Sequence, residues 1–535
     1  MKSKKINMLA GGLLLVSATA LASCGPSKGY TGDVDPTIDT RGVEIEFWSG
    51  FGSTISDQLE DLVLKNFSDK YQINVKHTSK GGYSGLQKAI NLSASSVTYP
   101  NIAVGYPDHF ASYIDSDIQL RLDSFIQSDA GIPESRTDED GTVFQEAAKI
   151  DMSDFYESYM TENRTLEYDD DGNPYTLGLP FNKSTEVLVY NKTFFENDWV
   201  KAAGIILPET WDEVETQGKK IIDLVTPHFG KVLGADGKDY DSLAKAKQAG
   251  TTLLMDLSTA KADNFYPLGY DSSANLFITG LRQWGATYTT IDQVTRHGYI
   301  GFDSGDSYTI ATQFLTYMQK LANEHVLALP TSFEGTALYC SSYFTNFQSV
   351  MNVGSSAGLS HYSEGSFTSA NGIYAGVSHI PYKTADKKYV ISQGTNLCML
   401  DKGSEAEREA SWKAVKYLAT EGNGLFASLT GYYPVCKSAA NSEIYQTFLT
   451  RTTDKDGNPL SDNDLNMQKA AKYNTESYDA DGSGWVKYTD PGFNGSSSIR
   501  EDVGNLISEI IVGKTAVKDT LDKYIAGLGD YRKYK

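Results

Sequence analysis

A serine between glycines is the first feature of this sequence that could perform chemistry. Residues 354–358 read Gly-Ser-Ser-Ala-Gly, which fits the Gly-x-Ser-x-Gly pattern of a nucleophile elbow with Ser356 at its tip. A serine hydrolase of this kind needs an acid and then a histidine further along the chain. Only His361 and His379 follow, and neither leaves room for the strands that normally separate these residues. Serine catalysis is therefore an alternative and not the leading hypothesis.

Binding of an oxyanion is a second kind of chemistry that the residues allow. Arg500 stands at the start of a predicted helix, and its planar guanidinium can grip a phosphate with two hydrogen bonds. Ser355 and Ser356 offer hydroxyl and backbone donors at another predicted helix start, where the helix dipole favours anions. The ordinary alternatives are a surface arginine and helix-capping serines.

Stacking against a sugar is a third possibility, because tyrosine is abundant. The chain has 34 tyrosines against 22 phenylalanines, and a tyrosine ring combines a flat apolar face with a polar tip. Tyr83 and Tyr432 lie in glycine-containing turns, and Trp48 lies in a predicted strand. These three rings are the candidate stacking faces for a neutral sugar, with packing in turns or in the core as the alternative.

The charge balance excludes one class of partner. The chain carries 47 basic and 68 acidic residues, a formal net charge of −21, and removing the three lysines of the first 23 residues makes it −24. A chain this acidic does not bind nucleic acid through its general field. It does contain many possible carboxylate pairs, so a glycosidase stays open as a second enzymatic alternative.

No cysteine or histidine pattern predicts a metal site. Cys340, Cys398 and Cys436 are far apart, and the seven histidines lack the paired spacing of zinc ligands. Four acidic turns contain Asp-Gly, but none has a glutamate at the twelfth position of an EF-hand loop. We assign these turns to solvated hairpins and keep calcium as the alternative. The turns are 138–141, 169–174, 454–459 and 479–482.

The elements that would position these residues alternate between strand and helix. Residues 43–48 alternate between apolar and polar, and helically spaced apolar residues separate the short strands that follow. This order predicts an α/β fold with a mainly parallel sheet covered by helices on both faces. Capping boxes at 210–213 and 404–407 mark two helix starts. Strands are predicted at 43–48, 73–75, 102–104 and 186–190.

The N-terminus has the pattern of an export signal. Three lysines precede an apolar run that is too short and too rich in small residues to span a bilayer comfortably. The run ends in Leu-Ala-Ser-Cys24, which resembles the lipobox of bacterial lipoproteins. That resemblance implies cleavage after residue 23, lipidation of Cys24 and a location outside the cytoplasm. Residues 24–41 are polar and rich in glycine, proline and aspartate, so we expect a flexible tether.

Several short motifs occur in the order found in one family. The motifs are Phe47-Trp48-Ser-Gly, Tyr99-Pro-Asn-Ile, 179–191 followed by Pro208-Glu-Thr-Trp-Asp-Glu213, Gln393-Gly394-Thr-Asn and Thr430-Gly-Tyr-Tyr-Pro-Val435. In these the chain resembles the extracellular solute-binding proteins of ABC importers. The resemblance implies a two-lobed α/β fold of the periplasmic-binding-protein type II, with a hinge and a ligand cleft between the lobes. It places one lobe at 42–182 with 394–447 and the other at 183–393 with 448–535.

The motif pattern is most similar to that of glycerol-3-phosphate-binding proteins. That likeness implies ligand-binding roles at matched positions and one doubtful position, because Pro107 occupies the matched place and Asp108 lies one residue beyond. Cleft-lining tryptophans of those proteins are absent here, where Gly269-Tyr270-Asp271 stands instead. The implied ligand residues are Tyr83, Asp108, Ser184, Ser355, Ser356, Gly394, Tyr432 and Arg500, with Trp48 as a further candidate for the cleft.

The resemblance therefore implies a receptor and not an enzyme. We expect a monomeric lipoprotein that captures a small solute by lobe closure and passes it to the permease subunits of an ABC transporter. The expected solutes are a glycerol phosphate or glycerophosphodiester first and a neutral oligosaccharide second. No cofactor, metal or nucleic acid is expected. An adhesin or structural lipoprotein is a third class that the cleft motifs disfavour.

Overall fold

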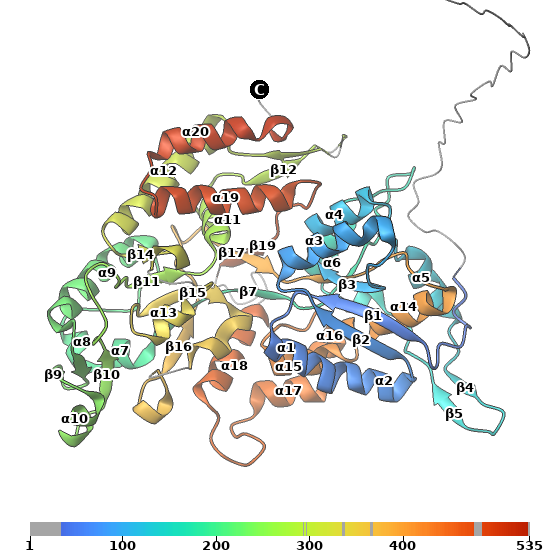
Figure 1. Cartoon of the computed structure of the whole chain (residues 1–535), viewed down its shortest axis with the longest axis horizontal. Helices are drawn as coiled ribbons and strands as arrows, with labels where there is room; N and C mark the ends of the chain where they lie inside the picture. Colours follow the sequence, from blue (N-terminus) through green and yellow to red (C-terminus); the bar gives the residue numbers. More distant parts are fainter. Residues whose placement is uncertain are drawn as a thin grey trace, which may run out of the picture.

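The computed structural model describes residues 34–292, 294–295, 297–333, 337–363, 367–475 and 484–532. The predicted signal peptide, Cys24 and the first part of the predicted tether lie outside these residues. Within the described ranges, no helix has both the length and the apolar character needed to cross a membrane. Figure 1 shows two halves side by side, each built on its own sheet, with β7 and β17 between them.

The first sheet has five strands in the order β2-β1-β3-β18-β6. β1 (Glu44–Ser49), β2 (Asn74–Ser79) and β3 (Ile102–Gly105) are parallel, as their alternation with helices predicts. β18 (Asn396–Met399) lies antiparallel to β3, and β6 (Leu179–Pro180) lies antiparallel to β18. β18 runs against β3 because it enters this half from the other one, at the edge where β3 ends.

Helices pack on this sheet and complete the first core. Phe67 and Tyr417, from helices distant in sequence, have ring centroids 5.2 Å apart. Trp412, on the same helix as Tyr417, is fully buried, and its ring centroid lies 5.9 Å from that of Phe125. The buried apolar residues of this core, within the described part of the chain, come from before 182 and after 396, and Ala357 of the other half packs against them. The helices are α2 (Lys65–Tyr71), α3 (Tyr83–Ser93), α4 (Pro107–Asp115), α14 (Glu405–Ala419) and α15 (Asn423–Thr430).

The second sheet is larger and mixed. Its strands run in the order β14-β11-β15-β7-β17-β19, and β16 also pairs with β7. β7 is antiparallel to β15, β16 and β17, whereas β11 is parallel to both its neighbours. The bounds are β7 (Ser184–Asn191), β11 (Leu268–Tyr270), β14 (Leu327–Ala328), β15 (Met351–Ser355), β16 (Ala375–Ser378), β17 (Lys388–Gln393) and β19 (Trp485–Tyr488).

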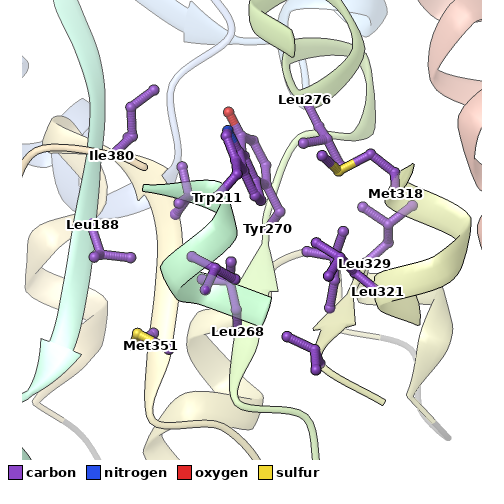
Figure 2. Close-up of a cluster of buried hydrophobic side chains, with 14 of the residues drawn as sticks. Leu188, Trp211, Leu268, Tyr270, Leu276, Met318, Leu321, Leu329, Met351 and Ile380 are labelled. Atoms are coloured by element: carbon purple, nitrogen blue, oxygen red, sulfur yellow. The ribbon is translucent and has the colours of Figure 1, made fainter. Parts of the chain in front are cut away.

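Figure 2 shows how this sheet and its helices share one core. Leu188, Leu268 and Met351 come from three neighbouring strands and face Leu276 and Met318 from two helices. Apolar side chains on one sheet face and on one stripe of each helix are removed from water together, which stabilises both elements. The helices that contribute are α9 (Trp211–Val225), α11 (Ser273–Trp284), α12 (Gly305–Asn323), α19 (Ser496–Ile511) and α20 (Val517–Gly527).

The sequence prediction of the α/β fold is confirmed, with one correction. Both predicted capping boxes are present, at the starts of α9 and α14. The strands that gave the expectation of a mainly parallel sheet, at 43–48, 73–75 and 102–104, are parallel, but both complete sheets are mixed because β7 and β18 run against their neighbours. The predicted lobe boundaries stay predictions, although the two cores divide the chain near residues 182 and 395.

The chain passes between the halves in short connections. Residues 181–183 join β6 to β7, and residues 394–395 join β17 to β18. A third passage, 451–461, links α17 (Glu443–Thr450) to α18 (Asp462–Thr475). Gly394 has a φ of 100°, and a Cβ added there would lie 1.9 Å from the carbonyl oxygen of Asn182. Only glycine lets these two connections lie this close together.

Replacement of Gly394 by alanine should therefore destabilise the protein. The left-handed backbone alone costs a residue with a Cβ about 1–3 kcal/mol, and the clash adds to that. We expect Gly394→Ala to lower the free energy of unfolding by more than about 2 kcal/mol, measured by urea denaturation. Gly358→Ala is the matched control, because nothing lies within 4 Å of its added Cβ. Equal stability of the two variants would contradict the steric argument.

Candidate functional site

A cavity of about 610 Å³ lies between the two sheets, at the carboxyl ends of several strands. The segments after β1, β3, β11 and β15 all contribute to it, as expected for the ligand crevice of an α/β sheet. Two candidates, Trp48 and Asp108, do not line it. The structure brings the other sequence-predicted residues together in its lining: Tyr83, Ser184, Ser355, Ser356, Gly394, Tyr432 and Arg500.

Asp108 and Trp48 have other surroundings. Asp108 lies in the first turn of α4, where one carboxylate oxygen accepts a hydrogen bond from the backbone N–H of His109 at 3.0 Å. Trp48 is half-buried against the first core, and the ammonium of Lys80 lies 3.5 Å from its ring centroid. Both residues are thus occupied by local interactions and sit outside the cavity lining.

The wall of the cavity from the first half is aromatic. The ring centroids of Tyr83 and Tyr106 lie 5.3 Å apart in an edge-to-face arrangement. Phe51 lies 6.4 Å from Tyr83 and 6.3 Å from Tyr432, so one apolar ring links the two tyrosines. Burial raises the pKa of Tyr83 well above its ordinary value, which keeps its hydroxyl protonated at all physiological pH values.

The opposite wall, from the second half, is polar and carries a linked set of side chains. Glu186 at the start of β7 accepts hydrogen bonds from the Tyr270 hydroxyl at 2.6 Å and from the Asn275 amide at 2.8 Å. The Asn275 carbonyl oxygen in turn accepts a hydrogen bond from the Arg500 guanidinium. Burial raises the pKa of Glu186 to about 7, against the opposing effect of these donors and of Arg500.

Asp271 is a second carboxylate on this polar wall. Its Oδ1 accepts hydrogen bonds from the Cys340 N–H at 2.7 Å and the Asn352 amide at 3.0 Å. Its Oδ2 lies against Gly354, where an added Cβ would approach it to 2.5 Å. Burial raises the pKa of Asp271 to about 6, so the carboxylate is ionised at pH 7.

Arg500 is therefore not a free anion receptor. It is already hydrogen-bonded to Asn275 and faces a wall with two carboxylates, Glu186 and Asp271. The guanidinium offsets the charge of Glu186 and orients Asn275 toward that carboxylate. Any anionic ligand would have to enter next to both carboxylates, at an electrostatic cost in a partly desolvated cleft.

Ser356, the nucleophile of the alternative hydrolase hypothesis, has a structural hydrogen bond in the folded chain. A strand and a helical turn do flank it, as a nucleophile elbow requires, but its Oγ accepts the backbone N–H of Thr185 at 3.3 Å. Ser355 Oγ caps the helical turn by accepting the N–H of Ala357 at 3.2 Å. The side chain is 1% exposed and serves the backbone of Thr185, which is the environment of a structural serine.

Sequence reasoning missed half of the polar wall and part of the aromatic one. Tyr106 lies two residues after the predicted strand 102–104, and Asp271 lies in the segment that the family resemblance matches to cleft tryptophans, so both had a signal in the sequence. Glu186 had a stronger one, since a carboxylate inside a buried strand needs a special reason. Asn275 had none, because its role depends on its contacts with Glu186 and Arg500.

The calcium alternative gains no support. In the turns at 169–174 and 454–459, the first aspartate accepts backbone N–H groups two and four residues later. These carboxylates close their own hairpins. Within the described part of the chain, no three histidine, cysteine or acidic side chains converge on a possible metal position. The turn at 479–482 lies outside the described residues.

Known structures share this architecture. The GacH receptor of Streptomyces glaucescens, solved with acarbose, aligns over 92% of this chain and 99% of its own, with 14% identity and a TM-score of 0.62. UgpB from Mycobacterium tuberculosis, in complex with glycerophosphocholine, aligns over 91% and 98%, with 15% identity and a TM-score of 0.62. A Listeria monocytogenes ABC substrate-binding protein in complex with cycloalternan aligns over 92% and 100%, with 15% identity and a TM-score of 0.60. These likenesses establish the two-lobed fold.

The sequence itself gives the family. No curated protein matches the chain. Residues 63–453, which are more than half of the chain, match the family described as bacterial extracellular solute-binding protein. The match spans most of the first half, the three tyrosines of the aromatic wall and the acids of the polar wall. The chain belongs to the family of bacterial extracellular solute-binding proteins.

Proposed function

We propose that this protein captures a neutral carbohydrate, of disaccharide to trisaccharide size, in the cavity between its lobes. The observation that carries the proposal is the division of the cavity into an aromatic wall with Tyr83, Tyr106 and Tyr432 and a polar wall with Glu186 and Asp271. A sugar ring has an apolar face of C–H groups and a rim of hydroxyls. Such a ligand would stack on the first wall and donate hydrogen bonds to the second.

The charges of the cavity decide the order of the ligand classes. The sequence alone ranks a glycerol phosphate ahead of a neutral sugar because of Arg500. The two carboxylates on the same wall reverse that order, since a phosphate would face both of them in a partly desolvated space. A glycerophosphodiester stays the second candidate. Arg500 favours it, and UgpB, one of the similar structures, binds glycerophosphocholine.

The proposed role of solute binding is delivery of the solute to a membrane transporter. We infer that closure of the lobes over the solute creates the form that the permease subunits of an ABC transporter receive. Lipidation at Cys24 would hold the monomeric protein at the outer surface of the cytoplasmic membrane, within reach of that permease. The solute leaves chemically unchanged, because binding and release are the whole of the activity.

A carboxylate substitution tests the carbohydrate proposal. We expect titration calorimetry with maltotriose to show binding that Asp271→Asn weakens at least tenfold, about 1.4 kcal/mol, because the amide replaces a charged acceptor of sugar hydroxyls. Asp108→Asn is the control, since Asp108 lies outside the cavity lining. Chromatography should recover the maltotriose intact. Equal effects of the two variants would contradict the assigned site, and cleaved sugar would favour a glycosidase.

The pH dependence of affinity gives a second test. A sugar hydroxyl donates to the ionised carboxylate, and the pKa of Asp271 is raised to about 6. Protonation of Asp271 therefore competes with binding below that value and should lower affinity about tenfold from pH 7 to pH 5. Glu186, whose pKa is raised to about 7, should add a smaller rise in affinity that continues above pH 7 and persists in Asp271→Asn. Asp271→Asn should remove most of the dependence between pH 7 and pH 5. An identical pH profile in wild type and variant would assign the titration to another group.

Arg500 separates the two ligand candidates. Arg500→Gln should weaken glycerophosphocholine by more than tenfold if the phosphodiester is the solute, because a charged hydrogen bond in a closed cleft is lost. For a neutral sugar the loss should be smaller, since Gln can still donate to Asn275. The comparison is made by calorimetry with both ligands on the same protein preparations. A large loss for glycerophosphocholine together with no sugar binding would overturn the carbohydrate proposal.

A further inference from the structure

A buried asparagine links the two chain connections to the aromatic wall of the cavity. Asn182 lies in the connection 181–183, is fully buried, and does not line the cavity. Its Oδ1 accepts hydrogen bonds from both the backbone N–H and the Oγ1 of Thr395, in the second connection. Its Nδ2 donates to the hydroxyl of Tyr83 at 3.0 Å.

We propose that Asn182 and Thr395 are positioning residues that couple the hinge between the lobes to the ligand-facing tyrosines. The inference rests on the proposed function only in assuming that the lobes move relative to one another when a solute binds. Through Asn182, any change in the spacing or twist of the two connections is transmitted to the Tyr83 hydroxyl. A ligand that fixes Tyr83 therefore favours one hinge geometry.

Burial makes the hydrogen bonds between Asn182 and Thr395 costly to break. Asn182 and Thr395 are both 0% exposed, so water cannot replace a broken hydrogen bond between them. A buried polar group that loses its partner costs about 1–3 kcal/mol. Gly394, directly before Thr395, packs against the backbone of Asn182, which leaves the side chains little freedom to shift. The connections 181–183 and 394–395 therefore either move together or lose the hydrogen bonds between Asn182 and Thr395.

The link reaches a second ligand-facing ring. The hydroxyls of Tyr83 and Tyr432 lie 3.5 Å apart, and both side chains line the cavity. The residue after Tyr432 donates its backbone N–H to the carbonyl of Lys183 at 2.8 Å, next to Asn182. Tyr432 is therefore tied to the same connection through the backbone as well as through Tyr83. One network joins the hinge to both tyrosines.

The experiment measures lobe geometry without any ligand. Single-molecule energy transfer is recorded between dyes on Leu92→Cys and Ile206→Cys, two exposed positions on opposite halves of the full-length protein. Thr395→Val removes the Oγ1 donor without changing the side-chain shape, and Thr395→Ser retains the donor. The native residues Cys340, Cys398 and Cys436 are buried and do not compete for the dyes. Cys24 is replaced by serine in every variant, so that it neither carries lipid nor takes up dye.

We expect Thr395→Val to shift the distance distribution and Thr395→Ser to restore it. In a Tyr83→Phe background, which lacks the other end of the link, Thr395→Val should add no further shift. With maltotriose as the probe, Thr395→Val should change the dissociation constant about five- to tenfold, although Thr395 touches no ligand. A role in packing alone would instead lower the thermal unfolding temperature and leave the distribution unmoved.

Two outcomes would overturn the inference: a distribution unchanged in Thr395→Val, or shifts from Thr395→Val and Tyr83→Phe that simply add. If Thr395→Val does not fold, the distance distribution of Tyr83→Phe is measured instead, because this variant removes the hydroxyl that Asn182 contacts. An unchanged distribution in Tyr83→Phe would then overturn the inference. Absence of maltotriose binding counts against the proposed carbohydrate and leaves the ligand-free measurement valid. The two proposals therefore fail separately.

Discussion

The connections between the two halves must be buried and yet hydrogen-bonded, and this constraint governs the rest of the structure. Lys183 is 1% exposed, and its ammonium reaches the carboxylate of Glu162 and the carbonyl of Gly394. Burial lowers the pKa of Lys183, while the nearby Glu162 opposes that shift. Asn396 donates to the same carboxylate at 2.7 Å. Removing one partner would leave a buried charge alone, so the set specifies one arrangement of the connections.

The position of the cavity follows from that arrangement. Strands of both sheets end where the connections cross, so the loops after β1, β3, β11 and β15 meet over one space. The first half supplies rings because its loops are packed by Phe51 and Phe426, next to Tyr432. The second half supplies a carboxylate at the connection because Glu186 is the third residue of the strand that leaves it, at the end of a run of buried polar residues from Asn182 to Glu186.

Residue patterns predicted the elements that depend on neighbouring residues in the sequence, and they failed where the structure depends on distant contacts. The alternation of 43–48 and the capping boxes at 210–213 and 404–407 depend on near neighbours in sequence, and they predicted their elements well. Strand direction in β7 and β18 depends on where the chain enters each sheet, which no local pattern encodes. The motifs pointed to most of the cavity lining because they include the connections of this chain, 181–183 and 394–395, and the turns beside them.

What a motif cannot supply is the partner of each side chain. Arg500 was correctly placed at the cavity, yet its expected role followed from its own chemistry in isolation. Asn275 and Glu186 change that role, because a guanidinium that already serves a carboxylate network contributes less to capturing a second anion. The same reasoning moves Ser356 from nucleophile to backbone partner of Thr185. In a cleft assembled from segments hundreds of residues apart, function is decided by such pairings, and only the folded structure reveals them.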